Sequence, residues 1–109
     1  MKNEYRNIDT SIVKSNFALF FEETKHLYNL VFLKKEQSTD SKNIKRYANE
    51  LFKAERISDY IYELIQDALN KYTLLLEVKA EPKLLTNLNK WINSAVKDIS
   101  AEINELTSK

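Results

Sequence analysis

The sequence predicts an all-α protein, and more closely an elongated antiparallel helical bundle of three long helices. Glycine is absent from the 109 residues and proline occurs once, whereas hairpin turns and tight strand bends depend on residues that tolerate positive φ. Apolar residues recur at alternating spacings of three and four over long stretches, which is the period of an amphipathic helix. The length and the 43% hydrophobic content are those of a globular chain, so we expect one domain over residues 1–109.

The first helix is expected at roughly residues 10–35. Asp9, Thr10 or Ser11 can accept hydrogen bonds from the free amides of its first turn. Its apolar face is wide enough to contact two neighbours rather than one. The residues of that face are Val13, Phe17, Phe20, Leu27 and Val31, widened by Phe21, Tyr28, Leu30 and Leu33. The polar segment that follows, KKEQSTDSKN at 34–43, predicts the first loop.

The second helix is expected at roughly residues 41–79, capped by Asp40 or Ser41. No proline or glycine interrupts its pattern before Pro82, so we expect one continuous helix of about 55–60 Å. Ten positions in this stretch keep the alternating spacing of three and four. They are Ile44, Tyr47, Leu51, Ala54, Ser58, Ile61, Ile65, Ala68, Tyr72 and Leu75.

The third helix is expected at roughly residues 82–106, because proline is well suited to the first turn of a helix. Its apolar positions are Leu85, Leu88, Ile92, Ala95, Ile99, Ile103 and Leu106, broadened by Leu84, Trp91 and Val96. At about 1.5 Å per residue, the first and third helices would each reach about 35–40 Å, too short to cover the second if they lie side by side. Either the second helix kinks, or the two shorter helices cover it in a staggered arrangement, or a second chain completes the bundle through dimerisation. With no proline or glycine to explain a kink, we expect one of the last two.

Composition excludes several broad classes of function. The formal net charge of +1 gives the whole chain no general attraction to nucleic acid or to an anionic membrane. Cysteine is absent, so thiol chemistry is excluded, and no apolar run approaches the roughly 20 residues of a membrane span. The polar start, MKNEYRNIDTS, lacks the apolar segment of a secretory signal. We expect a soluble, cytoplasmic protein that binds no membrane.

One pair of residues has the spacing of a metal site. Glu23 and His26 form Glu-x-x-His, the motif that ferritin-like di-metal sites place on helices. Such a site needs two of these pairs and further carboxylates, whereas His26 is the only histidine of the chain. A serine or threonine nucleophile would also need a base and an oxyanion site, and no motif supplies them. We therefore expect no metal, no cofactor and no enzymatic activity.

The charges of the second helix are polarised along its length. The basic stripe is Lys42, Arg46, Lys53 and Arg56, with Lys45 beside it, and the acidic stripe is Glu55, Asp59, Glu63 and Asp67. Like charges four residues apart cost about a few tenths of a kcal/mol each, so local helix stability does not explain the pattern. Two interpretations stay open: ordinary solvated helix faces with some chance clustering, or a pattern that steers a partner.

We expect a non-enzymatic protein-binding module that occupies the surface of a partner protein, in the manner of an inhibitor, immunity protein, antitoxin or chaperone. The expected contact is the charged, aromatic face of the second helix, because tyrosine is favoured in protein interfaces. Its residues are Arg46, Lys53, Arg56, Asp59, Tyr60, Tyr62, Glu63 and Asp67. The sequence does not identify the partner.

A second copy of the same chain is one candidate partner. In an antiparallel homodimer centred near Arg56, the basic half of the second helix would lie beside the acidic half of its mate. The small residues Ala54 and Ser58 would then let the helix axes approach closely. The alternative is that these small residues make room for large side chains within one chain.

The alternative function is that of a DNA- or RNA-associated regulator. It would use the basic half of the second helix, with Tyr47 and Tyr60 as aromatic contacts. The acidic half of the same helix would repel phosphates, which makes this the weaker hypothesis.

Overall fold

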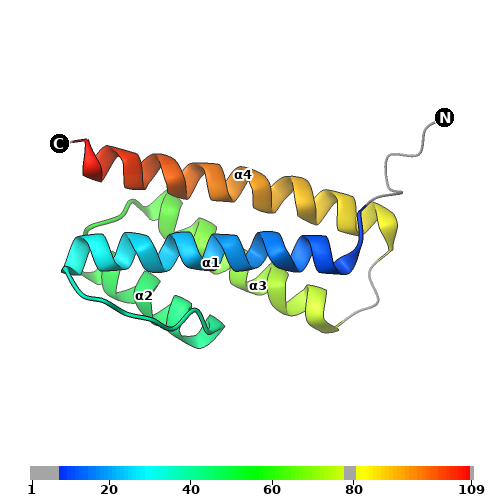
Figure 1. Ribbon diagram of the computed structural model, residues 1–109, viewed down its shortest axis with the longest axis horizontal. Coiled ribbons are helices and arrows are strands. Elements are labelled where there is room, and N and C mark those ends of the chain that lie inside the picture. Colours follow the sequence, from blue (N-terminus) through cyan, green and yellow to red (C-terminus); the bar gives the residue numbers. More distant parts are fainter. Residues whose placement is uncertain (1–7, 78–80, 109) are drawn as a thin grey trace.

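The computed structural model describes residues 8–77 and 81–108, and within them the chain forms four α-helices and no β-strand (Figure 1). The all-α prediction is confirmed. The prediction of three helices is wrong, because the stretch expected as one long second helix forms two. The helices are α1 (Thr10–Phe32), α2 (Ser41–Lys53), α3 (Asp59–Glu77) and α4 (Pro82–Thr107).

The expected second helix is interrupted just after Lys53, where the backbone turns left-handed. Glu55 has a φ of 57°, and its N–H donates to the carbonyl of Phe52 at 2.9 Å. The N–H of Arg56 donates to the carbonyl of Leu51, also at 2.9 Å. These two bonds are those of a Schellman motif, which satisfies the last carbonyls of a helix and usually places glycine at the left-handed position. Here glutamate takes that position. The helix therefore ends at this point although the chain contains no glycine.

The start of α3 has an ordinary cap. The N–H of Ile61 donates to Ser58 Oγ at 3.2 Å, and Asp59 supplies a negative charge in the first turn. Ile57, just before the cap, is buried. Ala54 and Ser58 are therefore helix ends, both exposed, rather than the close-packed centre of a rod.

The loop between α1 and α2 runs back along α1. Asn29 exchanges two hydrogen bonds with the backbone of Glu36, at 3.0 and 3.3 Å, and Lys25 Nζ donates to the carbonyl of Gln37. As a result α2 begins beside the middle of α1 and runs in the same direction (Figure 1). The expected antiparallel order of the first two helices is therefore wrong.

The remaining two helices, α3 and α4, each run antiparallel to the helix before them in the chain. Tyr62 of α3 contacts Asn49 and Phe52 near the end of α2, so these two helices form an antiparallel hairpin. α4 turns back again and runs parallel to α1. Its Asn89 lies at the level of Asn16, and Ser100 lies at the level of Glu23.

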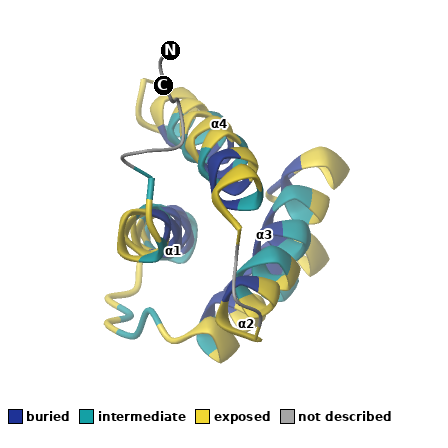
Figure 2. Cartoon of the chain, turned by 90° about the vertical axis from the view of Figure 1, so that its right-hand side faces the viewer, coloured by how far each residue is buried: buried dark blue, intermediate teal, exposed yellow. Residues whose placement is uncertain are grey.

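One hydrophobic core joins all four helices, and Figure 2 shows their buried faces turned toward one another. α1 contacts each of the other three helices. The largest fully buried side chains are Tyr28, Tyr47, Phe17, Phe20, Leu27, Ile44, Leu51, Ile65, Ile92 and Ile99. The structure measures 47 × 28 × 23 Å along its principal axes.

The break also removes the length mismatch that suggested a second chain. At 1.5 Å per residue, α2 spans about 20 Å and α3 about 28 Å, whereas α1 and α4 reach about 35 and 39 Å. The two halves of the expected rod therefore fit against α1 and α4 of the same chain. Of the apolar stretch near the end of α3, Leu75 is buried, while Leu74 and Leu76 are exposed.

The described helices include none that combines the length and the apolar character needed to cross a membrane.

Candidate functional site

The eight residues expected to contact a partner fall into separate places. Arg46 and Lys53 lie on α2, Arg56 lies in the connection, and the other five lie on α3. Three of the α3 residues line one groove against α4. They are Tyr60, Glu63 and Asp67. The basic residues do not join them, because the chain folds back between the two stripes.

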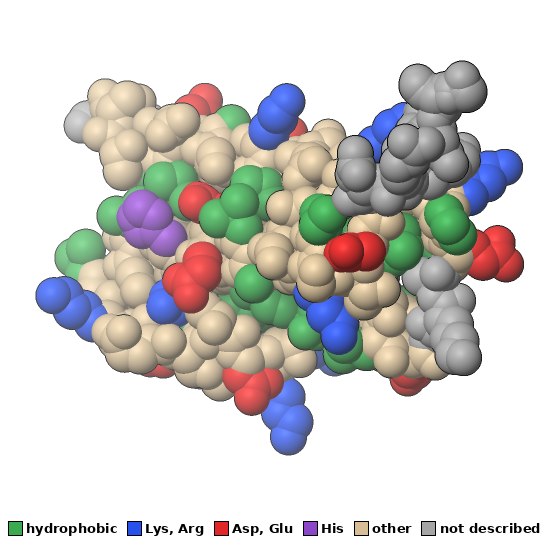
Figure 3. Space-filling model, turned by 45° about the vertical axis from the view of Figure 1, so that its right-hand side comes forward, with side chains coloured by type: hydrophobic (Ala, Val, Ile, Leu, Met, Phe, Trp, Pro, Cys, Tyr) green, Lys and Arg blue, Asp and Glu red, His purple; other side chains and the backbone are tan. Residues whose placement is uncertain are grey.

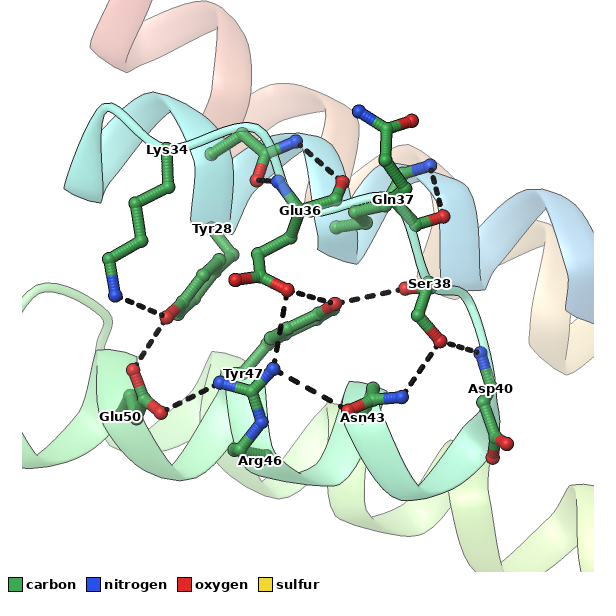
Figure 4. Close-up of polar contacts among 12 residues, drawn as sticks. Tyr28, Lys34, Glu36, Gln37, Ser38, Asp40, Asn43, Arg46, Tyr47 and Glu50 are labelled. Carbon is green, nitrogen blue, oxygen red and sulfur yellow. Dashed lines mark hydrogen bonds and ion pairs between the residues drawn. The ribbon is translucent and has the colours of Figure 1, made fainter.

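Arg46 is engaged within the fold (Figure 4). Its guanidinium donates to Glu50 at 3.0 Å and to Glu36 of the loop at 3.4 Å, and it lies 4.9 Å from the centre of the Tyr47 ring. The hydrogen bond from Arg46 to Glu50 raises the pKa of the guanidinium. Its contacts join α2 to the loop, so this predicted partner residue has a structural role.

Glu50 and the two tyrosines beside it complete this network. Tyr28 Oη donates to Glu50 at 2.6 Å, and this bond, followed by the one from Arg46, holds the pKa of the carboxyl below its usual value. The rings of Tyr28 and Tyr47 stack with centroids 4.4 Å apart, and Tyr47 Oη donates to the carbonyl of Ser38 at 3.0 Å. Burial raises the pKa of Tyr47. These contacts fix the loop between α1 and α2.

Tyr62 likewise serves the fold. Its ring stacks on Phe52 with centroids 4.2 Å apart, and its hydroxyl donates to Asn49 Oδ1 at 2.9 Å. Both partners belong to α2, so the contact closes the α2–α3 hairpin. Lys53 and Arg56 are exposed near the end of that hairpin and form no ion pair within the described residues.

Two adjoining hollows lie between α3 and α4, and Tyr60 lines both; together they are called the α3–α4 groove. The first has a volume of about 480 Å³ and is lined by Tyr60, Glu63, Leu64, Gln66, Asp67, Asn70 and Trp91. The second, of about 320 Å³, is lined by Ser58, Tyr60, Ile61, Asp98, Ala101, Glu102 and Glu105. The groove thus combines apolar and aromatic side chains with carboxylates from both helices.

Tyr60 is the most prominent side chain of the α3–α4 groove. It is 60% exposed, and its hydroxyl donates to Asp98 Oδ2 at 2.5 Å. This hydrogen bond raises the pKa of Tyr60. The ring is therefore held in place by α4 while most of it faces solvent.

Trp91, the only tryptophan of the chain, lies in the same groove. The ammonium of Lys71 is 4.6 Å from the centre of its ring and 2.8 Å from Asp67 Oδ2. A cation is thus held between an indole face and a carboxylate, where a cation–π contact adds to the ion pair.

The other four carboxylates that line the α3–α4 groove have no cationic partner among the described residues. Glu63, Asp98, Glu102 and Glu105 form no ion pair within the part of the chain that the structure describes. Asp67 is paired with Lys71, which leaves four of the five lining carboxylates without a cationic partner in the described part of the chain. The groove is therefore acidic although the whole chain has a net charge of +1. By contrast, the face shown in Figure 3 mixes acidic, basic and hydrophobic side chains.

Sequence reasoning missed the α4 side of this groove. Trp91 was assigned to the apolar face of its helix, and Asp98 and Glu102 were not singled out. One signal was present: Glu102 and Glu105 lie three residues apart, as neighbours on one helix face. That this face meets α3 depends on the packing of the helices.

A smaller hollow of about 210 Å³ lies on the basic side of the molecule, between α2 and α3. Its lining is polar, with two lysines from the predicted basic half. The residues are Ser41, Lys42, Lys45, Gln66, Leu69, Asn70 and Thr73. Two basic residues of the predicted second helix thus lie together at this hollow, which makes it the surface to test for nucleic-acid binding.

No metal cluster stands out among residues 8–77 and 81–108, where no group of three or more His, Cys, Asp and Glu side chains is placed to hold an ion. The two residues of the Glu-x-x-His pair, Glu23 and His26, also lie in different surroundings. Ser100 of α4 donates to Glu23 at 3.5 Å, whereas His26 is exposed.

Comparison with known protein families, with curated proteins and with solved structures gave no match for this chain.

Proposed function

We propose that this protein is a non-enzymatic protein-binding module that acts by occupying a partner's surface, with the α3–α4 groove as its contact. The observation that carries the proposal is Tyr60, which is 60% exposed at the junction of two hollows and is oriented by Asp98. Trp91 lies in one of them. Tyrosine and tryptophan are enriched among the residues that dominate binding energy, and a pre-positioned ring loses little freedom on binding.

The proposed mode of action is the one expected from the sequence, but the surface that contacts the partner is a different one. The expected face of one long helix is replaced by a groove between two helices, which retains Tyr60, Glu63 and Asp67 and adds residues of α4. An inhibitor, an immunity protein, an antitoxin and a chaperone all act by such occupation, and the proposal includes the cytoplasmic location expected from the sequence.

A homodimer remains a prediction, but the interface expected from the sequence has to change. The continuous rod centred near Arg56 is absent, and α2 already lies antiparallel to α3 within one chain. Any self-association would therefore use another surface, such as the α3–α4 groove of one copy against the basic residues of α2 in another.

Site-specific photocrosslinking tests the proposed function. A photoreactive phenylalanine analogue replaces Tyr60 in one variant and the exposed Leu19 of α1 in a control variant. We expect a crosslinked partner protein at Tyr60 and not at Leu19. The partner, identified by mass spectrometry and purified, should bind the native chain and lose affinity when Tyr60→Ala is introduced. A partner that binds Tyr60→Ala as tightly as the native chain would refute the assignment of the contact.

The second candidate function is nucleic-acid binding through the smaller hollow. Lys42 and Lys45 are exposed there beside the start of α2, a combination that suits a phosphate. A mobility-shift assay at two salt concentrations tests it, because phosphate contacts make affinity fall steeply with salt. Binding that persists in the variant Lys42→Gln/Lys45→Gln would contradict this candidate.

A further inference from the structure

We propose that the α3–α4 groove accepts a cationic segment of its partner, a stretch rich in lysine or arginine. This inference rests on the proposed function and adds the chemistry of the partner. Three observations support it: the charge of the groove, the contact of Lys71 with two of the residues that line the groove, and the length of the groove.

The charge of the α3–α4 groove is complementary to a basic segment. Glu63 from α3 and Asp98, Glu102 and Glu105 from α4 line it and have no ion-pair partner among the residues described. The only lysine or arginine between residues 91 and 105 is Lys97, and it lines neither hollow. Carboxylates from two helices that face one groove repel one another, and a basic ligand would relieve this repulsion.

Lys71, which itself lines neither hollow, shows how two residues of the groove hold a cation. Its ammonium lies 2.8 Å from Asp67 and 4.6 Å from the centre of the Trp91 ring. The same combination is available further along, where Tyr60 exposes most of its ring beside Asp98 and Glu102. Cations stack on tyrosine faces as they do on tryptophan. An ammonium or guanidinium from a partner would therefore find at Tyr60, Asp98 and Glu102 the kind of partners that Lys71 has.

The length of the groove suits a short segment. Its α3 wall runs from Ser58 to Asn70, which is about 18 Å at 1.5 Å per residue. An extended peptide covers that distance with about five or six residues. Alternate side chains of an extended strand point to the same side, so about three basic side chains would face the groove.

Trp91 provides the readout of the test, because it is the only tryptophan and lies in the groove. The probe is an acetylated, amidated decapeptide of alternating lysine and alanine, titrated at low ionic strength. The comparison peptide replaces lysine with glutamate. We expect a saturable change in tryptophan fluorescence with the lysine peptide, weakened by added salt, and none with the glutamate peptide. The same response to both peptides, or no response to either, would overturn the proposal.

Matched variants locate the binding. Glu63→Gln/Glu102→Gln removes one charge from each wall and should weaken the lysine peptide about three- to tenfold, because exposed charge pairs contribute modestly. Glu77→Gln removes an exposed charge from α3 outside the groove and should leave affinity unchanged. Equal affinities for all three proteins would place the peptide elsewhere and refute the inference. Light scattering of the chain alone adds a further check, since dimerisation abolished by Glu63→Gln/Glu102→Gln would show that the occupant is a second copy.

The inference and the proposed function can fail separately. A purified partner that needs Tyr60, together with a lysine peptide that does not bind, would leave the function standing and refute the cationic partner. A lysine peptide that binds as expected, together with no protein crosslinked at Tyr60, would refute the protein-binding function.

Discussion

The basic half and the acidic half of one charge-polarised stretch of sequence make different contacts in the folded chain. In the basic half, Arg46 lies within a network that joins α2 to the preceding loop, and Tyr47 is fully buried beneath it. In the acidic half, Tyr60 and Glu63 face an open groove, and Glu63 has no ion-pair partner within the described residues. A charge pattern alone therefore does not separate structural residues from residues available for binding. The packing of the neighbouring elements does.

The largest effect should come from truncating a tyrosine on the structural side. Tyr47→Ala removes a fully buried ring and its bond to the carbonyl of Ser38, so we expect a loss of about 3–5 kcal/mol in the free energy of unfolding. Tyr60→Ala should cost much less, since Tyr60 is mostly exposed. Urea denaturation followed by circular dichroism measures both. Losses of similar size would remove the contrast between the two regions.

The boundary between the two regions can be tested at its caps. Glu55→Gly should raise the free energy of unfolding by about 1 kcal/mol, because a left-handed φ of 57° strains glutamate and not glycine. Ser58→Ala should lower it by about 1 kcal/mol through loss of the α3 cap. Thermal unfolding provides the comparison.

The control for these cap variants is Lys53→Gly. Lys53 is the last residue of α2, and glycine there should destabilise the helix. Stabilisation by glycine at both positions would mean that the left-handed turn is not the cause.

These caps also show how far the sequence could lead. Asp9 and Asp40 were among the expected cap residues and accept the expected amide bonds, and Pro82 stands in the first turn of α4. The break after Lys53 was missed because glutamate carries no local signal for a left-handed backbone. The signal that did exist, Ser58 followed by Asp59, was interpreted as a small residue in a seam.

The candidate site was harder to predict from the sequence than the helix caps were. Tyr60, Glu63 and Asp67 were identified from one helix, yet the groove they line depends on α4, which follows about 20 to 40 residues later. The contact of Lys71 with Trp91 joins two helices whose relative rotation no periodic pattern defines. Periodicity predicts which face of a helix is apolar, and it leaves open which helix that face will meet.

The pH dependence of the structural network gives a smaller effect. Glu50→Gln keeps an acceptor for Tyr28 but removes the charge that Arg46 contacts, so we expect a loss of about 0.5–1 kcal/mol at pH 7, limited by solvent screening. Because the folded pKa of Glu50 is lowered, its contribution is present above the unfolded pKa and is lost as pH falls through the folded value.

The difference in unfolding free energy between the native chain and Glu50→Gln should therefore shrink in that acidic range. Urea denaturation at a series of pH values measures it. Glu22→Gln, which removes an exposed i,i+3 ion pair on α1, is the matched control for the loss of one surface carboxylate. A constant difference between the native chain and Glu50→Gln across the series would contradict the role assigned to the network.

The smallest effect is expected at the groove, where Asp98 orients Tyr60. Asp98→Asn removes the carboxylate that accepts the tyrosine hydroxyl, so the pKa of Tyr60 should fall back toward its ordinary value. The sign follows because the hydrogen bond to Asp98 favours the neutral phenol, and the nearby anion also disfavours the tyrosinate. NMR titration of the tyrosine rings measures the shift, and the melting temperature should stay nearly constant because the pair is exposed. A large fall in melting temperature would mean that this pair, like Tyr28 and Tyr47, supports the fold, and the contrast between the two regions would then fail.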